Sequence, residues 1–178
     1  MAMITFHKME DSRDPYFEEA RELYETAFPA KERRSVEQLK QILHHSIFHA
    51  DIVETDQKFT GILFWWQLGG FRFIEHFAIV SEFRGKGIGK QVLTDMIQKQ
   101  HTPIILEVEP ERSSPDAIRR IAFYKKSGFY LNPYPYFQPP YHPGNKPISL
   151  QIMSYPEQLN ASDFPLIVRK IHKEVYGR

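Results

Sequence analysis

Apolar residues recur along the chain at helical and at alternating spacings, and the order of the two patterns predicts a mixed α/β protein. Helical spacing predicts five helices, over about 14–28, 35–43, 88–100, 114–127 and 163–177. Short runs rich in β-branched and aromatic residues predict strands over about 3–9, 50–55, 59–68, 71–80, 103–110, 129–131 and 147–153. The predicted strand–helix–strand passage over 71–110 implies that its two strands pair in parallel. We therefore expect a mixed central sheet of about six to seven strands, flanked by four helices, with an extra C-terminal helix.

Residues at the helix ends support this pattern. Asp14 before Pro15 predicts an N-cap with proline at the first helical position. Ser35 and Gln38 have the spacing of a capping box, and Gly128 is typical of a helix C-terminus.

The chain contains no internal repeat and no domain linker. A single domain over 1–178 is therefore expected, with a core over about 4–155 and a C-terminal helical extension over about 161–176. The proline-rich segment 132–147 lies inside the strand series, so it is interpreted as a long loop.

Composition and charge exclude several classes of protein. The 178 residues carry a net charge of +1 and include no cysteine, which excludes disulfides, thiolate metal sites and a cysteine nucleophile. The eight histidines lack metal-ligand spacing, so no metal is expected. Nearly balanced charge argues against nucleic acid as a partner. The longest apolar run, GILFWW, is too short to span a bilayer, and the N-terminus lacks the apolar run of a signal peptide. A cytoplasmic protein with no membrane partner is therefore predicted.

The stretch Glu82–Leu93, EFRGKGIGKQVL, concentrates glycine and positive charge at a predicted helix start. Glycine lets a backbone approach a ligand closely, and free N–H groups at a helix start bind phosphates. A Walker-type loop would need glycine where Arg84 stands and Ser or Thr where Gln91 stands. A dinucleotide fingerprint matches poorly, because the third glycine, Gly89, comes one residue early. The third candidate is Arg/Gln-x-x-Gly-x-Gly/Ala, which Arg84, Gly87 and Gly89 satisfy.

This pattern resembles the pyrophosphate loop of the GNAT superfamily of acyl-CoA-dependent N-acetyltransferases. The wider segment HFAIVSEFRGKGIGKQVL is similar to the fourth strand, loop and third helix of that family. A second segment, AFYKKSGFYL, resembles its later signature, a helix ending Tyr-x-x-x-Gly-Phe, with Tyr124, Gly128 and Phe129 at these positions. The order of the predicted elements agrees with the family from about Ile4 to Tyr155.

The resemblance implies acetyl-CoA (or another acyl-CoA) as co-substrate, and transfer of the acetyl group to a primary amine by direct attack on the thioester. It also implies that the fourth strand is bulged and diverges from the fifth, and that the donor's arm fills the gap. The arm would pair with the backbone of Phe77, Ala78 and Ile79. The pyrophosphate would lie on the loop that follows, formed by Arg84, Gly85, Lys86, Gly87, Ile88, Gly89 and Lys90.

Two proton transfers then require side chains. The acceptor amine, with a pKa near ~10, must lose a proton, and the departing thiolate, at roughly 8.5 by analogy with cysteine, gains one. The resemblance assigns the second task to Tyr124. For the first, Glu75 and His76 are candidates, and we predict Glu75. Side chains alternate along a strand, so Glu75 and His76 should point to opposite faces, and only one of them can face the acceptor. Glu107 and Glu109 on the next strand are further candidates.

The acceptor is left open. The resemblance implies entry between the first two helices and the proline-rich loop. There, Glu32 suits a cationic acceptor, whereas Lys31, Arg33 and Arg34 suit a carboxylate. Small-molecule and peptide amines both remain open, as do a monomer and a homodimer. The family commonly has asparagine where Ala117 stands, so one polar contact to the donor arm is absent.

A rival interpretation is a non-catalytic acyl-CoA-binding sensor or interaction module of the same fold. Tyr124 and the open acceptor region favour the enzyme.

Overall fold

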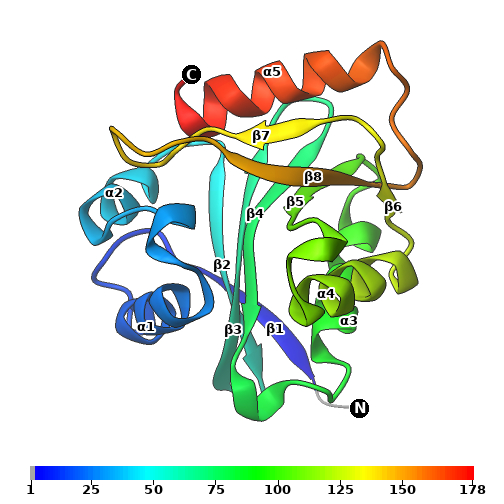
Figure 1. The fold of residues 1–178 in the computed structure, drawn as a ribbon. Coiled ribbons are helices and arrows are strands. Elements are labelled where there is room, and N and C mark those ends of the chain that lie inside the picture. The colour runs from blue at the N-terminus through cyan, green and yellow to red at the C-terminus, as the bar shows by residue number, and fades with distance from the viewer. Residues whose placement is uncertain (1–2) are drawn as a thin grey trace.

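The computed structural model describes residues 3–178, so Met1 and Ala2 of the predicted domain lie outside the described residues. A central sheet carries helices on both faces (Figure 1). Its strand order is β1-β2-β3-β4-β5-β8-β6, and β7 also pairs with β8. Among these described pairs, β4–β5 is parallel and the others are antiparallel.

The strands are β1 (Ile4–Lys8), β2 (Phe48–Thr55), β3 (Lys58–Gln67), β4 (Arg72–Ile79), β5 (Ile104–Val108), β6 (Tyr130–Leu131), β7 (Tyr136–Gln138) and β8 (Ile148–Tyr155). The α-helices are α1 (Phe17–Ala27), α2 (Val36–Ile42), α3 (Ile88–Lys99), α4 (Pro115–Lys126) and α5 (Asp163–Tyr176). The predicted mixed α/β class and the five helices are confirmed. The described sheet has eight strands, one more than expected.

The two faces of the sheet bury separate apolar clusters. One cluster joins α1, α2 and α5 to the sheet, and the other joins α3 and α4 to the opposite face. Figure 1 shows the same division, with α5 lying across β7. Each helix covers the sheet with one apolar side, as its helical spacing predicts.

The helix-end signals were accurate in two cases of three. Ser35 and Gln38 form the predicted capping box of α2, and Gly128 follows α4 with a φ of +90°. The Asp14 cap was wrong, because α1 begins only at Phe17. Asp14 instead accepts a hydrogen bond from the backbone N–H of Tyr16 at 2.9 Å, and so stabilises the turn before the helix.

The proline-rich segment also differs from its prediction as a plain loop. Tyr136–Gln138 forms β7, which pairs with β8 in the register Phe137↔Ser149. The prolines that flank β7 limit it to three residues, because proline cannot donate to a strand ladder. The pairing brings the side chains of Tyr136 and Gln138 beneath the C-terminal end of α5, where both contact the same carboxylate as Tyr176.

The strand β4 separates from β5 halfway along its length. The two strands pair only from Arg72↔Ile104 to Ile74↔Leu106. The register between β3 and β4 then shifts, since Trp65 pairs with Ile74 while Phe64 pairs with His76, which leaves Glu75 as the extra residue. A bulge of this kind bends a strand and ends its pairing. The expected bulge and divergence are therefore present.

The bulge overturns the prediction that Glu75 and His76 point to opposite faces. Glu75 contacts Arg34 and Trp66, and the ring of His76 lies 4.8 Å from that of Tyr24 in α1. Both side chains therefore lie on the face covered by α1, α2 and α5, because one extra residue reverses the alternation along the strand.

A buried ion pair holds the bulge. Arg34 donates a hydrogen bond to Glu75 Oε1 and another, at 2.9 Å, to the backbone carbonyl of Val175 in α5. Trp66 Nε1 and Tyr141 Oη also donate to the Glu75 carboxylate, each at 2.7 Å. Burial alone would raise the pKa of Glu75, but the charge of Arg34 and these hydrogen bonds hold it below its ordinary value. The pair therefore joins α5 and the proline-rich segment to β4.

Replacing Arg34 by alanine would leave the Glu75 carboxylate buried without its cation. We expect Arg34→Ala to lower the free energy of unfolding by about 3–5 kcal/mol, measured by chemical denaturation. The matched control is Arg13→Ala, because Arg13 also pairs with a carboxylate, Asp11, at 2.6 Å but is 89% exposed. The control should lose less than about 1 kcal/mol. Equal losses in the two variants would contradict the role given to the buried pair.

Candidate active site

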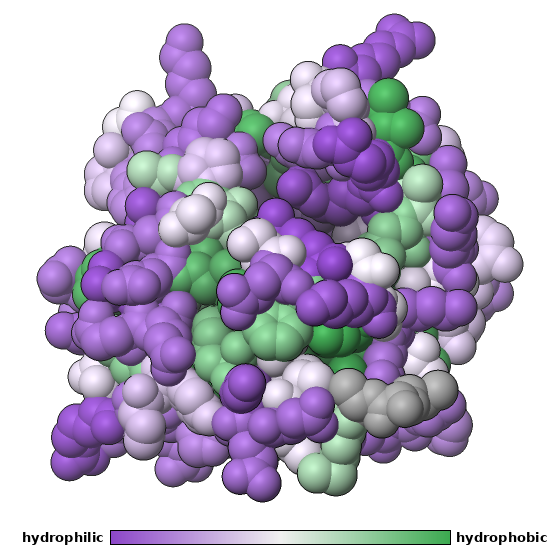
Figure 2. All heavy atoms as spheres, turned by 90° about the horizontal axis from the view of Figure 1, so that it is seen from below, coloured by the Kyte–Doolittle hydropathy of each residue, from purple (hydrophilic) through white to green (hydrophobic). Residues whose placement is uncertain are grey.

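The divergence of β4 and β5 opens a cavity of about 1170 Å³. Its walls include Phe77–Ile79 of β4, Leu106–Glu109 at the end of β5, and Tyr124 of α4. Residues of α1 line the opposite side, and the glycine loop lines one end. Figure 2 views the molecule from below Figure 1 and shows apolar residues within a mainly hydrophilic surface where the molecule is hollowed. Tyr124 and all of the predicted donor residues except Lys86 thus border one space.

The glycine loop is held where β4 ends. Arg84 Nε donates a hydrogen bond to the backbone carbonyl of Ile79 at 2.8 Å, so this arginine orders the loop as well as adding charge. Gly85 and Gly87 have φ values of +75° and +81°, which favour glycine. A Cβ at either position would meet no atom within 4 Å, so the space in front of the loop is open.

The backbone N–H groups of this loop are free. Across residues 3–178, none of the N–H groups of 85–90 donates a hydrogen bond to another backbone carbonyl. Gly87 is the N-cap of α3, and the helix continues for 12 residues. A helix start with free N–H groups is a favourable environment for an anion. The exposed side chains of Lys86 and Lys90 add positive charge beside it.

Tyr124 lies on the α4 wall of the cavity and is 7% exposed. Its ring packs between Phe123 and Phe129, with centroids 5.2 Å and 5.6 Å away. Its hydroxyl takes part in none of the hydrogen bonds within the described part of the chain. Burial raises the pKa of Tyr124 to about 12, so the hydroxyl keeps its proton at neutral pH.

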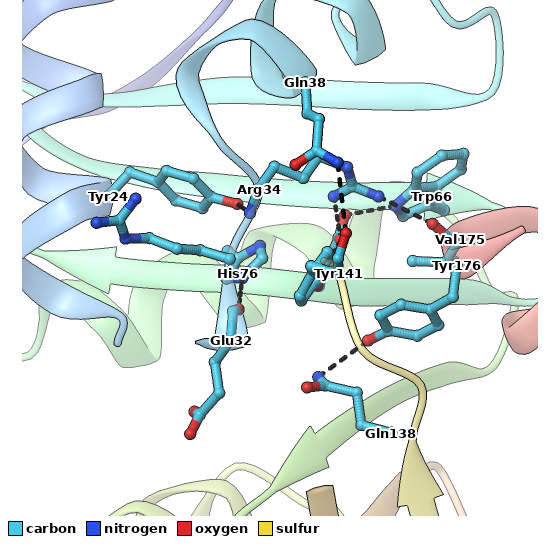
Figure 3. A network of polar contacts seen from close by, with 12 residues as sticks. Tyr24, Glu32, Arg34, Gln38, Trp66, His76, Gln138, Tyr141, Val175 and Tyr176 are labelled. Carbon is cyan, nitrogen blue, oxygen red and sulfur yellow. Dashed lines mark hydrogen bonds and ion pairs between the residues drawn. The ribbon is translucent and has the colours of Figure 1, made fainter. Parts of the chain in front are cut away.

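Glu107 lies on the β5 wall of the same cavity. Its carboxylate accepts hydrogen bonds from Tyr136 Oη, from Gln138 Nε2 at 2.6 Å and from Tyr176 Oη at 2.9 Å. Figure 3 shows Gln138 and Tyr176 joined to each other by a hydrogen bond of 3.0 Å. No cation of the described residues pairs with Glu107. Burial therefore prevails over these neutral donors and raises the pKa of Glu107 to about 7.

The carboxylates of Glu75 and Glu107 both line the cavity but differ in their partners. The Glu75 side chain is 0% exposed and accepts three hydrogen bonds, one of them from a guanidinium. The donors to Glu107 are all uncharged. Glu109, the other candidate on β5, pairs with Arg120 at 2.9 Å. Between Glu75 and Glu107, it is therefore Glu107 whose pKa lies nearer neutrality.

Sequence reasoning did not identify the residues that surround Glu107. In β7, the buried Tyr136 and Gln138 flank an exposed residue. This alternation was the one signal in the sequence for a strand with one side facing the site. Tyr176 belongs to the helix that was expected to lie outside the core. His142 contacts the carbonyls of Ala30 and Arg33 and so joins the proline-rich segment to the chain before α2.

Two further findings concern the described residues 3–178. No helix among them is both long enough and apolar enough to cross a membrane. No three or more of their histidine, aspartate and glutamate side chains are grouped as ligands of a metal ion would be.

Comparison with known proteins identifies the family to which the chain belongs. The family model for the acetyltransferase (GNAT) domain matches residues 44–131. A solved structure of a Bacteroides thetaiotaomicron protein assigned to the GNAT acetyltransferases is 32% identical, with a TM-score of 0.90, and the match covers 98% of this chain and 99% of that one.

Two other relatives are more distant. YjbC of Bacillus subtilis (strain 168), named as an acetyltransferase, is 28% identical over 103 residues, or 57% of this chain, and the chain spans only 52% of YjbC. A GNAT family acetyltransferase of Elizabethkingia anophelis, solved with acetyl-CoA bound, shares the fold at a TM-score of 0.57 and 17% identity, over 85% of this chain and 96% of that one. On the family model and the full-length relative together, the chain belongs to the GNAT family of acetyltransferases.

Proposed function

We propose that this protein is an N-acetyltransferase that transfers an acetyl group from acetyl-CoA to a primary amine. The observation that carries the proposal is the arrangement of one cavity. It has free backbone N–H groups at one end, an unpaired stretch of β4 along one wall, and two side chains suited to proton transfer, Tyr124 and Glu107.

The chain's own groups fit the donor. The free N–H groups of Gly85–Lys90, at the start of α3, would hold the pyrophosphate. The backbone of Phe77–Ile79 has no partner in β5 and would pair with the donor's arm. One fixed N–H of this stretch, aimed at the thioester carbonyl, would stabilise the negative charge that develops there. When bound, acetyl-CoA supplies the acetyl group as a reactive thioester.

Glu107 is the proposed general base. An alkylamine is mostly protonated at neutral pH, because its pKa lies near ~10. A carboxylate with a pKa of about 7 accepts a proton more readily than an ordinary carboxylate while remaining substantially ionised at neutral pH. Glu75 remains a prediction for this role, but its buried pair with Arg34 lowers its pKa and so makes it the weaker base. The environment therefore favours Glu107.

Tyr124 is the proposed general acid. Its raised pKa keeps the hydroxyl protonated, and it makes no competing hydrogen bond within the described residues. In the complete reaction the amine nitrogen bonds to the acetyl carbon and the carbon–sulfur bond breaks. Glu107 receives the proton lost by the nitrogen, and Tyr124 gives a proton to the departing sulfur before recovering one from solvent. Each charge that develops is thus neutralised by a group already in the cavity.

The donor assignment predicts the effect of a side chain in the glycine loop. Gly87→Val would place a branched side chain in the open space before the free N–H groups, so we expect it to weaken acetyl-CoA binding by about 100-fold or more, measured by calorimetry. Gly144→Val is the matched control, because Gly144 has a φ of +84° against +81° for Gly87 and equally open surroundings. Both variants should lose similar folding stability, whereas only Gly87→Val should lose the donor. Equal affinity for acetyl-CoA in the two variants would contradict a pyrophosphate site at the glycine loop.

The catalytic assignment predicts the pH dependence of turnover. With both substrates saturating, kcat should rise with pH through about 7 as Glu107 ionises. Glu107→Gln should lower kcat by about 10²–10⁴-fold and remove this dependence. Tyr124→Phe should lower kcat from neutral to alkaline pH, and Tyr130→Phe, at an exposed tyrosine, should not. Unchanged turnover in Glu107→Gln would reject Glu107 as the base.

A broad panel of amines separates the enzyme from the non-catalytic sensor. Stabilisation by acetyl-CoA without acetylation of any amine on the panel would favour the sensor.

The environment of Glu107 can also be tested without substrate. Folding raises the pKa of Glu107 from 4.5 to about 7, so its protonated form is the one the fold favours. The resulting stability is complete below pH ~4.5 and is lost as the pH rises through about 7. The melting temperature of Glu107→Gln relative to the unsubstituted protein should therefore increase steadily from pH 5 to pH 8. A difference independent of pH would show that Glu107 titrates normally.

A further inference from the structure

Apart from Glu75, Glu107 and Glu109, which belong to β4, to β5 and to the end of β5, the charged side chains that line the cavity are separated by sign. The basic ones belong to the glycine loop, α3 and α4: Arg84, Lys90, Arg119 and Arg120. The lining residues contributed by α1 and the turn Ala30–Glu32 are acidic where they are charged: Glu19, Glu22 and Glu32. On the basic side, Asp116 is paired with Arg119. The basic side matches the anionic donor, and the acidic side therefore suits a partner of positive charge.

Glu32 is the most enclosed carboxylate of the acidic side. Its side chain is 19% exposed, and the nearest cation, Lys31 Nζ, is 3.8 Å away on a side chain that is 62% exposed. Burial raises the pKa of Glu32 and the negative charge of Glu109 raises it further, while Lys31 and Arg120 lower it by less. Arg120 is already paired with Glu109 at 2.9 Å, so among the described residues only the exposed Lys31 lies close to the Glu32 carboxylate as a cation. An ammonium group of the acceptor would favour the ionised form of Glu32.

Two residues of the cavity lining also have a buried acceptor that lacks a donor within the described residues. Gln138 is 5% exposed, and its Oε1 has no hydrogen-bond partner, since its Nε2 serves Glu107 and Tyr176. The Nδ1 of His76 is likewise buried without a partner, while the Nε2 contacts the carbonyl of Glu32. Gln138 and His76 both line the cavity. Figure 3 shows the side chains of Glu32 and Gln138 extending to the same side of the Arg34 network.

These groups share one chemical property. Glu107, Glu32 and the free oxygen of Gln138 all accept hydrogen bonds, and a buried acceptor without a donor is unfavourable. An ammonium group offers three donors and a positive charge. Within the described residues, the Glu32 carboxylate and the Oε1 of Gln138 therefore lack donors, whereas Glu107 has uncharged donors but no cation.

We propose that the amine acceptor carries a second positive charge, as an alkyl diamine does, with the attacking nitrogen at Glu107 and Gln138 and the second ammonium at Glu32. This inference rests on the proposed function, since it names the acceptor class of the same site. Glu32 is the residue that would discriminate: it would select acceptors with a distal cation over acceptors with a distal methyl group or carboxylate. A peptide whose N-terminal residue is lysine offers the same two charges.

The first test measures binding, which does not require turnover. Titrations of the CoA-saturated protein at low salt would use 1,4-diaminobutane, butylamine and 4-aminobutanoate, with the three- and five-carbon diamines to find the best spacing. The diamine should bind about 10-fold or more tightly than butylamine, and 4-aminobutanoate should bind least. Glu32→Gln should remove the preference for the diamine and leave butylamine unchanged within about twofold. Glu10→Gln, at an exposed glutamate outside the cavity lining, should change neither ligand.

A second measurement separates the acceptor class from the function. Thiol release from acetyl-CoA is followed with the same amines and with the lysine-terminated peptide, whose use in place of the diamines would identify a peptide source of the two charges. Turnover of butylamine as efficient as that of every diamine and of the peptide, or an equal loss for all amines in Glu32→Gln, would overturn the inference and leave the N-acetyltransferase standing. Selective diamine binding without thiol release would support the inference and reject the enzyme.

Discussion

The buried pair between Arg34 and Glu75 is the interaction on which the site depends. Glu75 is the extra residue of the bulge that β4 forms against β3, and β4 separates from β5 at this point. Arg34 also holds the last turn of α5 through the carbonyl of Val175, and Tyr141 connects the proline-rich segment to the same carboxylate. The ion pair and its hydrogen bonds thereby stabilise a break in the sheet at which backbone groups are left unpaired. The cavity exists because this break is maintained.

The same break separates two carboxylates into different chemical environments. Glu75 meets a guanidinium and stays ionised, whereas Glu107, on the other side of the gap, meets only neutral donors. Proteins commonly assign structural and proton-transfer roles to carboxylates by such differences in surroundings. The choice between Glu75 and Glu107 therefore follows from their partners, although both are glutamates on adjacent central strands. In the proposed mechanism, Tyr136 and Tyr176 would act on the reaction through Glu107, by setting the protonation of that group.

What the sequence could predict follows from the range of each interaction. The capping box at Ser35, the turn at Gly128 and the glycine loop are decided by neighbours a few residues apart, so their local pattern was sufficient. The orientation of Glu75 depends on a bulge against β3, which no alternation within β4 reveals. The partners of Glu107 come from β7 and from Tyr176, 69 residues further along the chain. Long-range pairing of this kind leaves only a weak pattern in the sequence, which here is the alternating spacing of Tyr136 and Gln138.

The two halves of the site also differ in how much the family reveals about them. The donor elements, Phe77–Lys90 and Tyr124, all lie inside residues 44–131, the region that the family model matches. Glu32, Arg34, Gln138 and Tyr176 lie outside it. On the proposed function, binding of a common donor would constrain the first set, because the backbone and the glycines must fit one anionic group. The second set would lie toward the acceptor, so its charges would carry the information about substrate that the family does not. The acidic side of the cavity, formed by α1 and Glu32, is therefore where we expect the specificity of this chain to be encoded.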